Sequence, residues 1–189
     1  MKKFPVSSGS SDEELMQAVR LGDAYAFELL YRRYKTPIIS FTCRMVQNYQ
    51  KAEDLTQDIF LRILKKKKSY DVSKKFSGWL YRIASNTCID ELRRLKFTGP
   101  APEFEQESAP GDAGGNVPSE IEKSELQALI KKALNKLPKE QKTLVILHKY
   151  QNLKYEEIAD VFNKDFNWVK WQLKTAYDSL ENELRPYFK

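Results

Sequence analysis

Residues 52–64 read AEDLTQDIFLRIL, four lysines follow at 65–68, and residues 76–96 read FSGWLYRIASNTCIDELRRLK. In the first stretch, apolar residues recur at four-residue spacing, as in an amphipathic helix, and acids lie near its N-terminus, where negative charge suits the helix dipole. The second stretch has helical spacing too, with apolar residues along one side and polar residues along the other. We therefore expect an acidic and a basic amphipathic helix next to each other in the chain.

Positive charge and aromatic rings are concentrated in the same part of the sequence. Between residues 62 and 96, eleven Lys or Arg accompany only three acids, and Phe76, Trp79 and Tyr81 are interleaved among them. Cations that neutralise phosphates, beside rings on which unpaired bases stack, are typical of proteins that bind single-stranded nucleic acid. Taken singly, each of these residues fits the plainer alternative of core aromatics beside solvated lysines.

The two stretches resemble a known family. Residues 52–61 (AEDLTQDIFL) and 76–86 (FSGWLYRIASN) resemble the second conserved region of bacterial RNA polymerase sigma factors, above all those of the small two-domain extracytoplasmic-function (ECF) group. In that family the acidic helix docks on the clamp coiled coil of the polymerase's largest subunit. The following loop and helix open the promoter's minus-ten element and hold its non-template strand. The resemblance implies that core polymerase is bound by Asp54, Leu55, Gln57, Asp58 and Leu61. It implies that the minus-ten strand is bound by Lys67, Tyr70, Phe76, Arg82, Asn86, Asp90, Arg93 and Arg94.

The composition of the 189-residue chain narrows the classes of protein and of site. A formal net charge of +6 favours an anionic partner. Cys43, Cys88 and His148 lack the spacing of metal ligands, so we expect neither a metal site nor a disulfide scaffold, and no cofactor. Residues 1–11 lack an apolar segment, and no apolar run approaches the roughly 20 residues of a membrane span. This predicts a disordered N-terminal lead, no membrane insertion and a reduced, cytoplasmic protein.

The first 98 residues are expected to be helical. Residues 12–15 (DEEL) follow two serines that can cap a helix, and Gly22-Asp23 indicates a break. A further helix starts near Ala26, and we expect Pro37 to kink it or to divide it from the next. Glycine is scarce and no run alternates with period two, so residues 12–98 are predicted to form one helical domain.

Residues 99–120 break the helical pattern. Segments rich in Pro and Gly flank Glu103, Glu105 and Glu107, and residues 98–119 contain no Lys or Arg, a composition typical of a flexible linker. Fully extended, about 20 residues reach on the order of 65–70 Å. The negative charge would repel DNA and suit a basic channel, and the resemblance implies a path through the polymerase's RNA exit channel. A plain solvated tether explains the composition equally well.

Residues 121–189 contain a predicted helix-turn-helix. Apolar spacing indicates helices over 126–137, 139–150, 155–162 and about 166–184, and Asn163-Lys164-Asp165 forms the turn between the last two. The second helix of such a unit enters the major groove of DNA. Residues 134–159 also look like the fourth region of the sigma family, which reads the minus-thirty-five element. The resemblance implies contacts there from Tyr155, Glu156, Asn167, Trp168, Lys170, Trp171 and Lys174.

Several residues depart from the family's fourth region and leave its mode of promoter reading open. Asn163 replaces the usual glycine of the turn, which is tolerable because Asn adopts left-handed geometry more readily than most residues. Lys164 replaces an apolar residue, and the usual arginines of the second helix are reduced to two lysines. Trp168 and Trp171 stand where the family generally has small hydroxyl residues. Since indoles left in water are unfavourable, we expect both to be covered by DNA, by the first domain or by a partner, and we favour a protein surface.

The sequence as a whole predicts an all-α protein of two small helical domains joined by a flexible acidic linker. The resemblance implies an alternative sigma factor, which binds core RNA polymerase and promoter DNA and is commonly controlled by an anti-sigma factor. No nucleophile–base set, paired carboxylates or phosphate loop points to an enzyme. Two alternatives stay open: a helix-turn-helix regulator that works without core polymerase, and a sigma-like interaction protein that no longer reads promoters.

Overall fold

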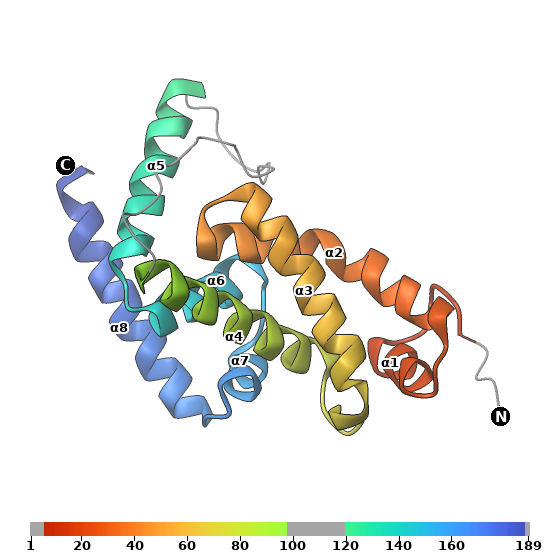
Figure 1. The fold of residues 1–189 in the computed structure, drawn as a ribbon. Coiled ribbons are helices and arrows are strands. Elements are labelled where there is room, and N and C mark those ends of the chain that lie inside the picture. Colours follow the sequence, from red (N-terminus) through yellow and green to blue (C-terminus); the bar gives the residue numbers. More distant parts are fainter. Residues whose placement is uncertain (1–5, 98–119, 188–189) are drawn as a thin grey trace.

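The computed structural model of the chain describes residues 6–97 and 120–187, and every regular element in these two ranges is a helix. The first range forms α1 (Asp12–Arg20), α2 (Ala24–Val46), α3 (Tyr49–Lys66), the 3-10 turn η1 (Lys67–Ser69) and α4 (Phe76–Phe97). The second forms α5 (Glu120–Lys136), α6 (Lys139–Tyr150), α7 (Tyr155–Phe162), α8 (Phe166–Leu184) and the 3-10 turn η2 (Arg185–Tyr187). The described residues thus confirm the all-α prediction. Figure 1 shows the two sets of helices side by side. No helix in the described ranges is long and apolar enough to cross a membrane.

The helices of the first domain begin where polar side chains accept hydrogen bonds from free backbone N–H groups. Ser11 and Glu14 form a reciprocal capping box at the start of α1. Asp23 accepts from the first backbone N–H groups of α2. Glu13 reaches from α1 to the Phe76 N–H at the start of α4, with 3.0 Å between oxygen and nitrogen. The caps thus set the helix starts, and the last one also ties α1 to α4.

The structure differs from two expectations for the first domain: Pro37 does not divide the helix in which it lies, and part of the N-terminal lead has a defined turn. α2 is one continuous helix although Pro37 lies inside it, because the buried side chains of α2 lie on both sides of the proline and pack in the same core. Of the lead expected to be disordered over residues 1–11, residues 1–5 lie outside the described residues, and residues 7–10 form a turn. Arg33 holds this turn by donating to the carbonyl oxygens of Ser8 and Ser10 at 3.0 and 3.1 Å. Composition alone cannot show a contact that comes from a helix more than 20 residues away.

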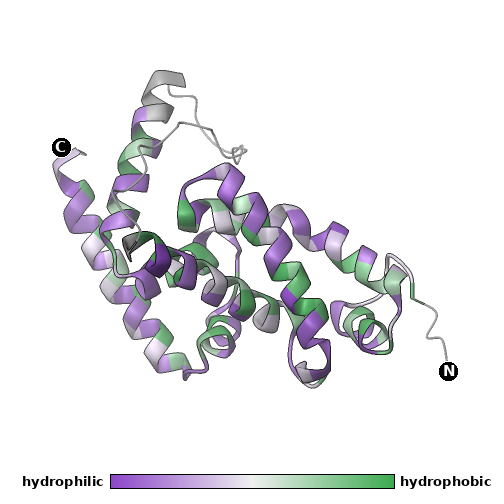
Figure 2. Ribbon diagram, in the orientation of Figure 1, coloured by the Kyte–Doolittle hydropathy of each residue, from purple (hydrophilic) through white to green (hydrophobic). Residues whose placement is uncertain are grey.

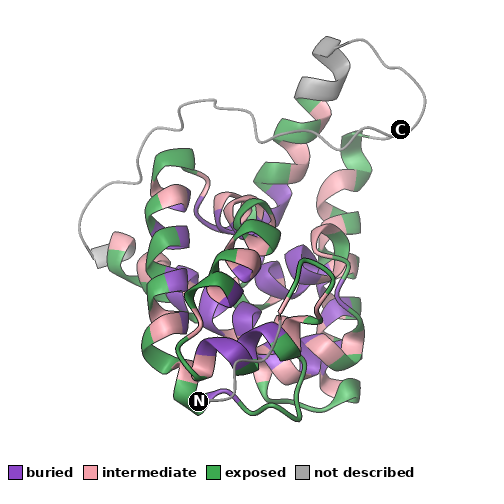
Figure 3. Cartoon of the chain, turned by 90° about the vertical axis from the view of Figure 1, so that its right-hand side faces the viewer, coloured by how far each residue is buried: buried purple, intermediate pink, exposed green. Residues whose placement is uncertain are grey.

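The apolar sides of the helices meet in one core. Figure 2 shows hydrophobic and hydrophilic residues alternating around the helices, and in Figure 3 the buried residues gather toward the middle of the molecule. Phe41, Phe76 and Leu80 are fully buried in the first domain, and Leu144 is fully buried in the second. Cys88 is buried, and burial raises the pKa of its thiol to about 12, as suits a small core residue.

The second domain contains the predicted helix-turn-helix, formed by α7, a short turn and α8. Asn163 ends α7 in the left-handed conformation, with φ of 53°, as the sequence predicts. Asp165 then caps α8 by accepting from the Trp168 N–H at 2.8 Å. Val169 and Leu173 are fully buried, which fixes the inner side of α8 and leaves its opposite side to solvent.

The two domains contact each other in two places. α4 lies against α7, and α2 lies against α6. The linker predicted over residues 99–120 lies outside the described residues, except for residue 120, which begins α5. The structure therefore shows a direct contact between the domains that the composition of the linker does not indicate.

Candidate functional site

One side of α3 holds most of the residues that the sequence assigns to core polymerase. Asp54, Gln57, Asp58 and Leu61 are exposed, Leu61 to 52%. Asp54 lies three and four residues before Gln57 and Asp58, and Leu61 lies four and three residues after them, so all four share one side of the helix. Leu55 is only 6% exposed and packs in the core, so its assignment to the polymerase surface is corrected. We call the four exposed residues the α3 face. It is an acidic surface with one accessible leucine.

The aromatic residues assigned to the minus-ten strand lie in the core. Tyr70 is 2% exposed and Phe76 is fully buried, with 6.1 Å between their ring centroids. The Tyr70 hydroxyl donates to the Lys74 carbonyl oxygen at 2.5 Å, and burial raises the pKa of Tyr70 to about 12. Neither ring is free to stack on a base, so the predicted stacking role of both is corrected to a packing role. They shape the loop between η1 and α4, while Trp79 covers Tyr70 at a ring distance of 5.2 Å.

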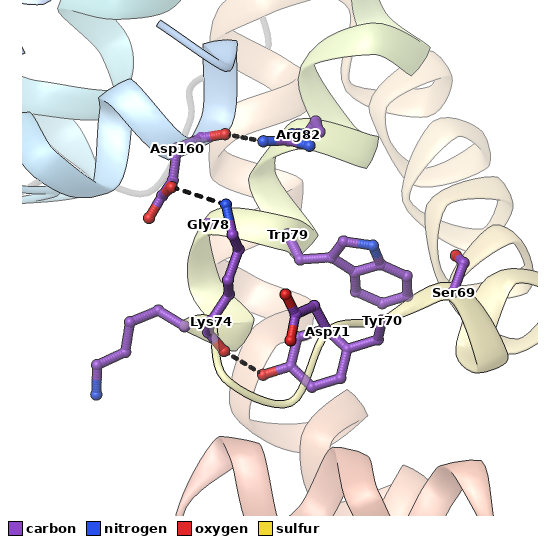
Figure 4. A pocket seen from close by; sticks show the side chains of 9 residues that line it. Ser69, Tyr70, Asp71, Lys74, Gly78, Trp79, Arg82 and Asp160 are labelled. Carbon is purple, nitrogen blue, oxygen red and sulfur yellow. Dashed lines mark hydrogen bonds and ion pairs between the residues drawn. The ribbon is translucent and has the colours of Figure 1, made fainter. Parts of the chain in front are cut away.

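An open cavity of about 340 Å³ lies beside this loop. Its walls come from the loop, from the first turns of α4 and from α7. In Figure 4, Trp79 and Arg82 extend from α4, and Asp160 faces them from α7. Lys74 and Lys75 also line the cavity, so cationic groups stand beside an indole ring. Lys67 lies half-buried in η1, at the other end of the loop.

The polar stripe of α4 is divided between solvent and the second domain. Four of the predicted minus-ten residues are exposed on α4: Asn86, Asp90, Arg93 and Arg94. The guanidinium of Arg82 instead donates to the backbone carbonyl oxygens of Asp160 and Val161, the latter at 3.2 Å. A second cavity, of about 490 Å³, lies between this part of α4 and the end of α7. Two of the donor nitrogens of Arg82, Nε and Nη2, are thus engaged by α7 and not available to DNA in this arrangement.

The outer side of α8 holds most of the predicted minus-thirty-five residues. The exposed ones are Asn167, Lys170, Trp171 and Lys174. Trp168 is half-buried, with its ring centroid 5.5 Å from that of Phe162. On α7, Glu156 is exposed, while Tyr155 packs on His148 with 5.1 Å between their rings. The spacing of the four exposed residues of α8 places them on one face, and we call them the α8 face.

Comparison with known proteins identifies the family. Residues 30–98 match the family model of Sigma-70 region 2, and residues 127–171 match that of Sigma-70, region 4. The ECF RNA polymerase sigma factor SigW of Bacillus subtilis is 32% identical over 180 residues, which cover 90% of this chain and 95% of that relative. The chain belongs to the ECF group of the sigma-70 family. The RNA polymerase sigma-H factor of Pseudomonas aeruginosa is a further relative of this sigma factor, 27% identical over 94% of this chain and 96% of its own.

Two solved structures share the fold of this sigma factor. CnrH, solved in complex with the cytosolic domain of CnrY, matches 94% of this chain and 99% of its own, with a TM-score of 0.71 and 20% identity. The sigma factor RpoE of Bartonella quintana, solved in complex with the anti-sigma factor NepR, matches 84% of this chain and 96% of its own, with a TM-score of 0.65 and 21% identity. At these identities the likeness concerns the fold alone.

Sequence reasoning missed the residues that join the two domains of this sigma factor at α4 and α7. Beside the Arg82 contact, the Tyr81 hydroxyl donates to Gln151 Oε1 at 2.7 Å, and Ser77 Oγ donates to Glu157 Oε1 at 3.1 Å. A Cβ on Gly78 would stand 3.5 Å from the nearest side-chain atom of α7, so the two helices approach closely there. These partners are 70 and 80 residues apart in the chain, and no local pattern relates them.

Lys142 joins the domains of the sigma factor at the contact between α2 and α6. Its ammonium donates to the Met45 carbonyl oxygen and to Asn135 Oδ1, each at 2.8 Å, and the residue is 6% exposed. Asn135 and Gln47 exchange two side-chain hydrogen bonds across the same contact, at 2.6 and 2.8 Å. Because the charged ammonium is desolvated, its pKa is lowered to about 8. The sequence offers no signal for this residue, since a lysine in an amphipathic helix normally faces water.

Proposed function

We propose that this alternative sigma factor binds core RNA polymerase through the α3 face and directs promoter recognition and opening. The observation that supports this most strongly is the exposure of that face within the segment that matches Sigma-70 region 2. Its two carboxylates suit a basic surface, and the accessible Leu61 adds an apolar anchor. Association with polymerase places the protein in the cytoplasm, and it performs no catalysis of its own.

Promoter opening is assigned to α4 and the loop before it. Asn86, Arg93 and Arg94 are exposed along α4 and offer amide and guanidinium groups to an unpaired strand. In the cavity of about 340 Å³, Lys74 and Lys75 stand beside Trp79. Separation of the domains would remove Asp160, the partner of Lys74, and leave these cations and the ring to an unstacked base. The mechanism is differential binding, because bases that are exposed only in the open promoter gain these contacts and paired bases do not.

The contact between the domains restricts one residue of this surface, Arg82. Arg82 is bonded to α7 in the structure, whereas the α3 face and the α8 face are exposed. Core polymerase can therefore bind first, and the domains must then separate before Arg82 reaches the minus-ten strand. A partner that holds the two domains together would keep Arg82 bonded to α7. We propose an anti-sigma factor for this role, because the Bartonella RpoE of similar fold was solved in complex with the anti-sigma factor NepR.

Run-off transcription with purified core polymerase, on DNA from upstream of the protein's own gene, tests the proposal. We expect a discrete transcript that needs both the protein and core. Co-purification with core in the same preparation distinguishes the alternatives. A helix-turn-helix regulator that works alone would bind the DNA without binding core, and a sigma-like interaction protein would bind core and give no transcript. Either result would overturn the proposed function.

A further inference from the structure

The two tryptophans of α8 have different environments. Trp168 is half-buried, because the ring of Phe162 lies 5.5 Å from its own and the Lys164 ammonium lies 5.8 Å from its ring centroid. Trp171 is 61% exposed, more than any other large hydrophobic side chain in the described part of the chain. Trp168 is thus partly covered by its own domain, a source of cover that the sequence did not indicate. The first domain does not cover Trp171, although the two domains are in contact.

Trp171 is surrounded by positive and polar side chains. Lys170 and Lys174 are exposed next to it on the α8 face, and Asn167 is exposed one turn earlier. The first acid along the same face, Asp178, comes about two turns after Trp171. Whatever covers this indole must therefore also accept hydrogen bonds from two cations and one amide.

The major groove of DNA meets these conditions better than a protein surface. The cores of protein interfaces are depleted of lysine and are built on apolar patches, whereas Trp171 is a single apolar group among lysines. In the major groove, phosphates and base edges accept from Lys and Asn, and the C5-methyl of thymine is an isolated apolar group. The surroundings of Trp171 thus favour DNA, whereas the sequence favours a protein surface.

We propose that Trp171 is a specificity-determining residue whose indole packs on a thymine methyl in the minus-thirty-five element. Lys170 and Lys174 contact the flanking phosphates. This inference rests on the proposed function and adds to it a preference for the C5-methyl group of one thymine. Loss of the methyl should weaken binding about fourfold, which corresponds to the ~0.8 kcal/mol of one buried methyl-sized group.

Selection and base replacement together test the inference. The holoenzyme, made from core and the full chain, selects duplexes from a pool randomised over the minus-thirty-five segment. We expect at least one strongly preferred thymine. In a selected duplex, deoxyuridine then replaces that thymine and removes only the methyl. The wild-type holoenzyme should bind the deoxyuridine duplex about fourfold more weakly, and Trp171→Ala should bind the two duplexes equally.

Two further variants serve as matched controls. Lys174→Ala should weaken binding to both duplexes alike. It should also reduce the slope of the logarithm of the binding constant against the logarithm of the salt concentration by about one, as expected for loss of a phosphate contact. Trp168→Phe, which keeps a ring against Phe162, should retain the full effect of the methyl. Circular dichroism verifies that each variant is helical, and affinity for core alone should not change in Trp171→Ala.

The possible failures are distinguishable. If the holoenzyme selects no sequence and makes no transcript, the proposed function fails. If it selects and transcribes but tolerates deoxyuridine at every preferred thymine, only the role of Trp171 is overturned. The same conclusion follows if Trp171→Ala keeps the methyl effect, or if it loses affinity for core polymerase alone, which would make the indole a protein contact.

Discussion

Lys142 should give the unfolding free energy of this sigma factor a measurable dependence on pH. Burial lowers its pKa from 10.5 to about 8 in the folded chain, and the unfolded chain has the ordinary value. Below pH 8, folding therefore bears the full cost of burying a charge, and that cost is relieved as the pH rises toward 10.5. One pKa unit corresponds to about 1.4 kcal/mol, so the whole cost is about 3 kcal/mol. About 2 kcal/mol of it should be regained between about pH 7 and pH 9.5.

The assay compares urea unfolding of the wild-type chain and of Lys142→Met at those two pH values. Methionine keeps a long apolar side chain and removes the charge. The thiol of Cys88 has a pKa raised by burial to about 12, and it lowers stability above pH 9 because the unfolded chain can ionise it. This effect is present in both chains and largely cancels in the difference. From about pH 7 to pH 9.5, the unfolding free energy of the wild type should rise by about 2 kcal/mol more than that of Lys142→Met.

Parallel pH dependence in the two chains would refute the reasoning. It would mean that the ammonium of Lys142 is hydrated in solution and that its hydrogen bond to the Met45 carbonyl oxygen, 2.8 Å in the structure, does not persist. Since this bond joins α6 to α2, the result would also contradict the closed arrangement of the two domains. If the unfolding free energy rises more with pH in Lys142→Met than in the wild type, the sign of the predicted effect is wrong and the reasoning is refuted too.

Three further predictions concern the proposed surfaces and the core. Asp58→Lys combined with Gln57→Ala should abolish co-purification with core polymerase and leave the helical circular dichroism intact; retained binding would remove the α3 face from the proposal. Asn86→Ala should weaken open-complex formation more than core binding, and unchanged permanganate reactivity of melted thymines would show that the strand is held elsewhere. Asp160→Lys places a cation beside Lys74, which now lies 3.4 Å from the Asp160 carboxylate, and should separate the domains. Small-angle X-ray scattering should then give a larger radius of gyration, and an unchanged radius would show that this contact does not hold the domains closed.

The aromatic residues between positions 62 and 96 show what the pattern of cations and rings could not decide, namely which rings are buried. Lysines and rings alternate between residues 62 and 96, which fits both a nucleic-acid surface and a core beside solvated lysines. The structure supports the second interpretation for Tyr70 and Phe76, which are buried, whereas Trp79 lines a cavity. Tyr70 lies in the loop between η1 and α4, which helical periodicity does not cover, and Phe76 is the first residue of α4, so the sequence could not show that these two rings point inward.

The helix boundaries were determined by the sequence itself, because they depend on groups only a few residues apart. Ser11 with Glu14 caps α1, Asp23 caps α2, and Asn163 turns the chain before α8, and each of these acts within about one helical turn. The family was also evident from the sequence, because its motifs are continuous stretches of residues.

The accessibility of Arg82, in the proposed promoter surface, was decided only by the tertiary structure. Arg82 has its partners 78 and 79 residues further along the chain, and Lys142 reaches back 97 residues to Met45. Whether a cation on a helix faces water, DNA or another helix depends on which surface packs against it. That choice is made by the shape and burial of distant side chains, and the spacing of residues within a single helix contains no information about it.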